Sequence, residues 1–331
     1  MKLHLFNPEN DLALAAGTAN FTPPKSVVRF RTALAALPAW LAAPGDNVVA
    51  PEVDPSWFAA AGLEVGTRPE GEPEPWGWSA NAVSLFRRLG IDGPFPDTDA
   101  LRRLSHRRTA LALHSALRPL LPYPLPPEPM EITSVAELPD TDRIVLKSPW
   151  SCSGRGVVDC EGLTADNIRR RAADSIRRQG SVMVEPKLRR VRDFAMLFDR
   201  HRFCGLSVFF NNGTAYAGNL VAPQTELAAE IGADFLDETA AAVEASLPEG
   251  YDGPLGVDMM VYETDDRRRL ICPTVEVNLR KTMGFVALAL AARFGRGRFA
   301  ISAGSAPPSS SPAIKLIPDN PYFSATFTPQ P

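Results

Sequence analysis

The sequence predicts an α/β domain at the N-terminus, followed by a larger α+β region built mainly from antiparallel strands. Strand and helix signals alternate over roughly the first hundred residues, a pattern typical of a parallel sheet covered by helices. After a proline cluster at residues 119–129, the pattern changes to strands joined by tight turns. With 331 residues, the chain is long enough for two or three domains that share one cleft.

Caps, prolines and apolar runs locate the elements of the N-terminal part. Asp11 can cap a helix, Ser79 can cap another, and Pro38 interrupts a helical stretch. We therefore expect strands at 2–6 and 47–50, helical stretches at 11–16, 29–43 and 79–89, a turn at 7–10 and a loop at 68–78.

The second part begins with a helical stretch at 101–117 and continues through the proline-rich linker at 119–129. Asn211-Asn212-Gly213 is a turn signal between two strands. We expect strands at 143–147, 181–185, 193–198, 203–210, 214–221, 256–263 and 269–277, and helices at 225–247 and 283–294. From Gly304 onward the chain is rich in Pro and Ser, with one strand-like piece at 313–317.

The bulk properties exclude several classes of function. A net charge of −3 gives no overall attraction to nucleic acid or to an anionic membrane, and no apolar run is long enough to span a bilayer. The N-terminus lacks the features of a signal peptide. The four cysteines show neither a CxxC pair nor a disulfide spacing, which favours reduced thiols and a cytoplasmic location.

A strand at 144–147 ends in Lys147 and is followed by a Ser/Gly loop, Ser148 to Gly156. Such a loop can close over a polyphosphate with its backbone N–H groups, while the lysine supplies a positive charge. The spacing is not that of a P-loop. A hairpin with a lysine at its rim is the alternative interpretation.

A second apolar strand, VMVEP, ends in Glu185 and Pro186. A hinge of this kind can bind adenine through backbone groups, with the acid near the exocyclic amine and the proline carbonyl as an acceptor. An edge strand that ends in a turn is the alternative.

The most informative pattern is a pair of strands that carries acids. Glu276 and Asn278 lie at i and i+2, so their side chains leave the same face of one strand, and Arg280 follows on that face. Asp258 lies on the expected hairpin partner. Two carboxylates and an amide oxygen are ligands that suit Mg²⁺, and an arginine beside them can hold a phosphoryl group. A salt-bridged sheet face is the alternative.

Taken in order, Lys147 with its loop, VMVEPKL, RDFAM, LGVDMMV and EVNLRKTMG resemble the motifs of the ATP-grasp superfamily over about residues 105 to 295. The resemblance implies a Rossmann-like pre-ATP-grasp domain followed by an ATP-grasp fold of two subdomains. The boundaries we expect are 1–104 for the first domain, 105–303 for the second with a split near 185–190, and 304–331 for the tail.

The resemblance also implies roles for individual residues. Lys147 and Arg107 would contact phosphate, although the family usually has a lysine where Arg107 stands. Ser153, Gly154 and Gly156 would belong to the phosphate loop. The remaining roles are adenine binding by Glu185, the Pro186 carbonyl and the Leu188 amide, ribose binding by Asp193, magnesium binding by Asp258, Glu276 and Asn278, and phosphoryl contact by Arg280.

The first loop of the N-terminal domain, with Glu9, Asn10 and Asp11, is the expected source of substrate contacts, because ligands of open α/β sheets lie beyond the strand ends. A capping turn is the alternative. The expected function is an ATP- and Mg²⁺-dependent ligase that joins a small-molecule carboxylate to an amine. A small-molecule kinase and a non-catalytic nucleotide-binding protein remain as alternatives, and a homodimer is left open.

Overall fold

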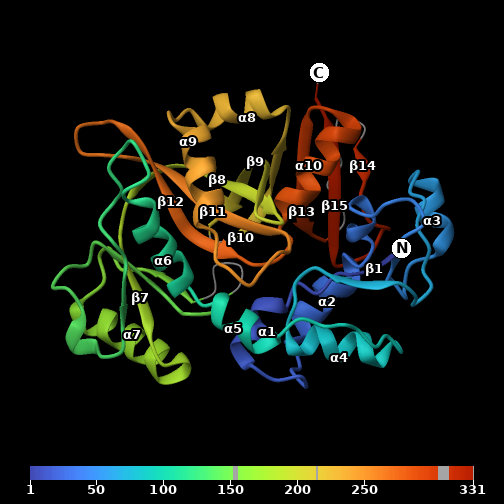
Figure 1. Ribbon diagram of the computed structural model, residues 1–331, viewed down its shortest axis with the longest axis horizontal. Coiled ribbons are helices and arrows are strands. Elements are labelled where there is room, and N and C mark those ends of the chain that lie inside the picture. The colour runs from blue at the N-terminus through green and yellow to red at the C-terminus, as the bar shows by residue number, and fades with distance from the viewer. Residues whose placement is uncertain (152–155, 214, 305–312, 331) are drawn as a thin grey trace.

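The chain is described by a computed structural model that covers residues 1–151, 156–213, 215–304 and 313–330. The strands in these residues form three sheets. Figure 1 shows the small sheet that contains β7 on the left, the large sheet in the centre and right, and the first hundred residues at the lower right. Among the described residues, no helix combines the length and apolar character needed to cross a membrane.

A three-stranded parallel sheet begins the chain. Its order is β2-β1-β3, with β1 (Lys2–Leu5) between β2 (Asn47–Val48) and β3 (Glu72–Pro75). Leu3 and Leu5 of the central strand are buried together with Phe86. The helices of this part are α1 (Asn10–Ala16), α2 (Lys25–Ala33), the 3-10 turn η1 (Leu37–Trp40), α3 (Pro55–Ala60) and α4 (Ala80–Arg88).

Several expectations for this part are wrong in detail. The loop expected at 68–78 contains β3, whose Glu-Pro-Glu-Pro sequence is tolerated because β3 is an edge strand and an outward N–H needs no partner. Helix α1 has Glu9 at its N-cap, so Asp11 lies in the first turn. The stretch expected at 29–43 divides into α2 and η1. Ser79 does cap α4, because its side chain accepts a hydrogen bond from the Ala82 amide.

The small sheet is antiparallel and has the order β4-β7-β5-β6. Its strands are β4 (Met130–Ile132), β5 (Ile144–Lys147), β6 (Val157–Asp159) and β7 (Val182–Pro186), with the 3-10 turn η2 (Val135–Glu137) beside them. Helix α7 (Ala165–Gln179) covers the sheet and buries Ile168 and Ala172 against Leu146 and Val184. Helix α7 contains five arginines and only three buried residues, so its outer face is exposed to solvent.

The large sheet has eight antiparallel strands in the order β12-β11-β8-β9-β10-β13-β15-β14. They are β8 (Arg189–Asp199), β9 (Arg202–Asn212), β10 (Ala215–Val221), β11 (Leu255–Glu263), β12 (Arg269–Asn278), β13 (Gly297–Ala303), β14 (Ile314–Lys315) and β15 (Phe323–Pro329). The stretch expected as a tail thus supplies β14 and β15, and it buries Leu316 and Phe327 completely. These apolar side chains explain why the segment joins the sheet despite its prolines and serines.

Two helical stretches expected to be continuous are each divided in two. The first forms α5 (Thr98–Leu104) and α6 (Arg108–Leu117), and the second forms α8 (Gln224–Ile231) and α9 (Leu236–Ser246). Gly232 ends α8 in the left-handed conformation, with φ of 63°. The break between α5 and α6 places Arg107 at the start of a helix that contacts β12.

Two apolar cores lie against the large sheet. One contains side chains of α6, α8 and α9, such as Leu113, Leu227 and Val243. The other lies beneath α10 (Met283–Phe294) and joins Leu290 of that helix to Phe327 and to Phe6 of the N-terminal part. This second core fixes the N-terminal sheet against the last strands of the chain, so both can border one cavity.

Candidate active site

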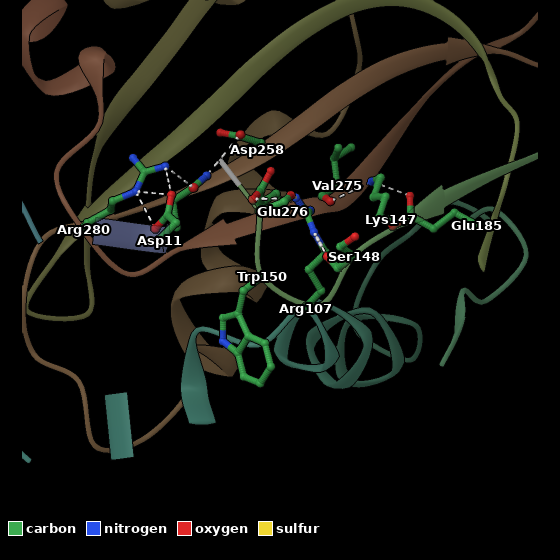
Figure 2. A network of polar contacts seen from close by, with 12 residues as sticks. Asp11, Arg107, Lys147, Ser148, Trp150, Glu185, Asp258, Val275, Glu276 and Arg280 are labelled. Carbon is green, nitrogen blue, oxygen red and sulfur yellow. Dashed lines mark hydrogen bonds and ion pairs between the residues drawn. The ribbon is translucent and has the colours of Figure 1, made fainter. Parts of the chain in front are cut away.

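A cavity of about 840 Å³ borders the small sheet, the large sheet and the N-terminal part. Pro8, Phe30 and Trp76 reach it from the N-terminal part. Most residues predicted for the site line this cavity, namely Arg107, Lys147, Glu185, Pro186, Leu188, Asp193, Asp258, Glu276, Asn278 and Arg280. Figure 2 shows a row of polar contacts that runs from Asp11 and Arg280, past Asp258 and Glu276, to Lys147 and Glu185.

The predicted metal ligands lie on the hairpin of β11 and β12. Asp258 is paired directly with Glu276, so the two carboxylates belong to opposite positions of neighbouring strands. The Asn278 side-chain amide donates a hydrogen bond to Asp258 Oδ2 at 3.1 Å. Burial, followed by the negative charge of Glu276, raises the pKa of Asp258 to about 7, against the opposing effect of Arg280. Because the two carboxyl groups are close together, ionisation of one makes ionisation of the other less favourable.

These residues fit a hard divalent cation by their donor types. No group of three or more His, Cys, Asp and Glu side chains that could hold a metal occurs in the described part of the chain. A magnesium ion held at this site would use Asp258, Glu276 and the Asn278 oxygen, and would take its other ligands from phosphate and water. The raised pKa of Asp258 shows that its ionised form is disfavoured in the metal-free site. A cation bound by these residues would stabilise that ionised form.

Arg107 connects the predicted phosphate loop to the predicted metal strand. Its guanidinium lies 2.9 Å from Glu276 Oε1, donates to the Ser148 carbonyl at 3.0 Å, and donates to Ser151 Oγ at 2.8 Å. Its backbone N–H donates to the Pro149 carbonyl. The side chain is 8% exposed. The guanidinium therefore connects the start of α6 to the loop and to β12. The single ammonium group of a lysine could not make these contacts with the same geometry.

Lys147 lies at the end of β5 and faces the other side of the same site. Its Nζ is 2.5 Å from Glu185 Oε2 and donates to the Val275 carbonyl at 3.1 Å. Val275 precedes Glu276 on β12, so Lys147 links the small sheet to the strand that carries the acids. Lys147 is only 6% exposed, so it is not a solvent-exposed lysine at the rim of a hairpin.

The predicted adenine and ribose residues lie where β7 passes into β8. Glu185 and Pro186 end β7, and Leu188 stands between the two strands. Asp193 on β8 is held by Arg190 and by the Asn211 amide, each at 3.1 Å. Burial raises the pKa of Asp193, while Arg190 and Asn211 act in the opposite direction. All of these residues line the cavity, including Asn211 near the end of β9.

The phosphate loop is only partly described. Ser153 and Gly154 lie outside the described residues. Gly156 adopts φ of 78°, and its carbonyl accepts a hydrogen bond from the Ser148 amide at 2.9 Å, which closes the base of the loop. A side chain at Gly156 would meet Ser148 Oγ at 2.8 Å, so the position also requires the small residue. Gly156 does not itself line the cavity.

Trp150 anchors the start of this loop, which the sequence did not indicate. Its ring lies under the Arg102 guanidinium at 4.3 Å and meets the His106 ring edge to face at 4.5 Å. Its indole N–H donates to the Arg102 carbonyl at 3.1 Å. Burial, followed by the charge of Arg108, lowers the pKa of His106 to about 4, so this ring is neutral at pH 7.

Of the three N-terminal residues predicted to contact substrate, Asp11 reaches the site, through Arg280. Asp11 holds Arg280, which also donates to Asn278 Oδ1 at 2.9 Å. Glu9 and Asn10 are each 1% exposed and do not line the cavity. Glu9 instead lies 2.5 Å from the Arg31 guanidinium. The expected substrate contacts of Glu9 and Asn10 are therefore not supported, since both side chains are directed into the protein.

No family model matches the sequence, and no curated protein matches it. Several solved structures share the fold. A protein of Archaeoglobus fulgidus described as ATP-grasp superfamily has a TM-score of 0.51 and 13% identity, with 100% of both chains covered. Biotin carboxylase of Campylobacter jejuni, in a β,γ-ATP complex, has a TM-score of 0.53 and 11% identity over 98% of this chain and 87% of that one.

A third structure is N5-carboxyaminoimidazole synthase of Aspergillus clavatus, in complex with ADP and 5-aminoimidazole ribonucleotide. It has a TM-score of 0.52 and 14% identity, and covers 99% of this chain and 93% of its own. At such identities the likeness concerns the fold.

Proposed function

The chain has the ATP-grasp fold, and on that premise we propose that it is a magnesium-dependent ligase. It would activate a small-molecule carboxylate with the γ-phosphate of ATP and pass the acyl group to an amine, releasing ADP and phosphate. The observation that carries the proposal is the convergence on one cavity of Lys147, at the end of β5, with Glu276 and Arg280, at the end of β12, two segments that are distant in sequence. Two of the similar structures are complexes with β,γ-ATP or with ADP, which supports a nucleotide in this cavity.

The chemistry balances without a protein nucleophile. A carboxylate oxygen attacks the γ-phosphorus, a P–O bond to ADP breaks, and an acyl phosphate forms. The amine nitrogen then attacks the acyl carbon, a C–N bond forms, and the C–O bond to phosphate breaks. Phosphate leaves with that electron pair, and the proton lost from nitrogen passes to water. The protein's contribution is therefore positioning and charge neutralisation.

Each charged residue has a distinct task in this proposal. Lys147 neutralises phosphate oxygens, and Glu185 orients the lysine while it meets the adenine amine. Arg107 holds the phosphate loop against Glu276, and Arg280 faces the reacting phosphoryl group with its orientation fixed by Asp11. Magnesium, bound by Asp258, Glu276 and Asn278, would supply charge that stabilises the developing phosphate oxyanions.

The three-stranded sheet at the N-terminus would serve as the Rossmann-like domain that precedes the ATP-grasp part. Its strands are parallel, and Trp76, which follows its edge strand β3, borders the cavity. Cys160, Cys204 and Cys272 are free thiols among the described residues, which supports a reducing, cytoplasmic setting.

The nucleotide products test this function. Purified protein is incubated with Mg-ATP and pooled carboxylates and amines, and the nucleotides are separated by chromatography. We expect ADP and phosphate, formed only when both pools are present. AMP with pyrophosphate would contradict the acyl-phosphate route, and a stable phosphorylated compound formed without amine would assign the chain to the kinases. ATP binding without turnover in any pool would indicate a nucleotide-binding protein.

A further inference from the structure

The cavity extends beyond the nucleotide residues into a second part, which we call the acceptor compartment. Its walls come from the N-terminal part, from β9 and β10, and from the start of α10. The residues that define it are Phe30, Trp76, Ser207, Tyr216, Asn219 and Met283. It adjoins the reacting end of the site, because Gly77 pairs with Arg280 and the Lys281 amide donates to the Trp76 carbonyl at 2.8 Å.

One wall of the acceptor compartment is a fixed set of aromatic rings. Phe6 lies behind Trp76 and Phe30, with ring centroids 5.0 and 5.9 Å away. Phe30 also meets Phe323 of β15 edge to face at 5.0 Å. All of these side chains belong to the apolar core that joins the N-terminal part to the C-terminal strands. The wall is therefore rigid and suits a flat apolar body.

Another part of the lining, on β9 and β10, carries neutral hydrogen-bonding groups. The Tyr216 hydroxyl donates to Asn219 Oδ1, and Asn219 Nδ2 donates to Ser207 Oγ at 2.7 Å and to the Val208 carbonyl at 3.1 Å. Asn219 is completely buried, and these bonds occupy its amide. Tyr216 Oη keeps its lone pairs for a further donor, so a ligand N–H or O–H can bind there.

The compartment offers no uncompensated positive charge in the described residues. Arg280 is the basic side chain of the cavity that adjoins it, and both carboxylate oxygens of Asp11 contact its guanidinium. The other basic residues of the cavity belong to the nucleotide end, on α6, β5 and the passage from β7 to β8. A carboxylate or phosphate on the acceptor would therefore lose its water without gaining an uncompensated cationic partner among the described residues.

On the basis of the proposed function, we propose that the acceptor is a primary amine carried on an aromatic ring, without a carboxylate or phosphate group. The ring lies against Trp76 and Phe30, and a polar group on the ring donates to Tyr216. Amino acids and nucleotides are excluded as acceptors because they bring an anion into this compartment.

Binding to the full chain in the presence of Mg-ADP tests this assignment by titration calorimetry. Tyramine and tyrosine are a matched pair that differ by one carboxylate, and ethanolamine lacks the ring. We expect tyramine to bind at least about tenfold more tightly than either. Equal or tighter binding of tyrosine, of ethanolamine or of 3-(4-hydroxyphenyl)propionate would overturn the proposal. Absence of tyramine binding would overturn it as well.

Substitutions of two residues of the compartment, Met283 and Tyr216, provide a second test. Met283→Lys introduces a cation at a partly exposed position, and Met283→Gln is its uncharged control of similar length. We expect the lysine variant alone to lose the preference for tyramine over tyrosine. Tyr216→Phe should weaken tyramine binding roughly fivefold and leave ADP affinity unchanged. If ADP does not bind to the wild type, the proposed function fails, whereas ADP binding with the wrong amine preference contradicts only this inference.

Discussion

Asp11 in the first turn of α1 holds Arg280, which follows β12, through both carboxylate oxygens. The distances are 2.8 Å from the terminal nitrogen to Oδ2 and 3.1 Å from Nε to Oδ1. Both side chains are about one fifth exposed, at 17% and 20%. The pair lies beside Asn278, so a residue of the N-terminal part sets the orientation of a guanidinium at the reacting end of the site.

Asp11→Asn should lower turnover about tenfold while the KM for ATP changes little. The amide cannot accept two charge-assisted bonds, so Arg280 loses its fixed direction where the acyl phosphate forms, whereas the nucleotide contacts remain. Steady-state kinetics measure both constants. Asp99→Asn, in the exposed first turn of α5, is the matched control and should behave as wild type. A raised KM with unchanged kcat would show that Asp11 acts on ATP binding instead.

The hairpin that carries the acids could be predicted from the sequence, because a polar turn at 264–266 lies between two apolar strands. The register does not follow from the turn alone, because the pairing of Met260 with Cys272, continued without a break, would set Asp258 opposite Thr274. A bulge between Met260 and Asp258 shifts the register, so that Asp258 pairs with Glu276. The placement of Lys147 and Glu185 in one site was expected from the resemblance to the ATP-grasp motifs, since β6 and α7 separate their strands β5 and β7 in the chain. The hairpin itself depends on local pattern and on two strands that are neighbours in the chain.

Contacts between distant segments could not be predicted in this way. Asp11 and Arg280 are 269 positions apart, and they meet only because the core under α10 fixes the N-terminal sheet in place. Strand β3 was missed because Glu-Pro-Glu-Pro has no strand propensity and pairs at an edge. The role of Trp150 was missed because a cation–π contact with Arg102 leaves no periodic signal.

Arg107→Lys should raise the KM for ATP about tenfold and also lower kcat. Lysine keeps the charge but cannot reach Ser148, Ser151 and Glu276 together, so the phosphate loop loses its link to β12. Kinetics at varied ATP concentration measure the effect. Arg108→Lys is the neighbouring control, since Arg108 is exposed and contacts Glu131. Equal kcat and KM values in the two variants would show that Arg107 has no role in ATP binding or turnover.

Glu276→Gln should lower turnover by about two to three orders of magnitude, because it removes one charge that faces the metal and the phosphates. The fold should survive, since glutamine is isosteric. Activity and circular dichroism together measure this. Glu263→Gln, at the far end of the same hairpin, is the control and should retain activity. A Glu276→Gln protein with near-normal ADP release would exclude this residue from the metal site.

The pH dependence of stability tests the burial of the Asp258 carboxyl beside Glu276 in the metal-free protein. Folding raises the pKa of Asp258 from 3.8 to about 7, so the folded state binds this proton more tightly than the unfolded state does. The stability that follows from the shift is present below about pH 4 and is lost as the pH rises toward 7. Asp258→Asn carries no such charge, so its stability should not fall over this window.

We therefore expect Asp258→Asn to stabilise the metal-free protein more at pH 8 than at pH 5, by roughly 2 kcal/mol. Denaturant unfolding in the presence of EDTA at the two pH values measures the difference. Asp266→Asn, in the exposed turn of the same hairpin, should show no such gain at pH 8. Added Mg²⁺ and ADP should reverse the order, because a cation between Asp258 and Glu276 stabilises the wild type and the variant lacks one ligand charge. If Asp258→Asn gains equally at both pH values, burial and the charge of Glu276 do not raise the pKa of Asp258 as the geometry requires.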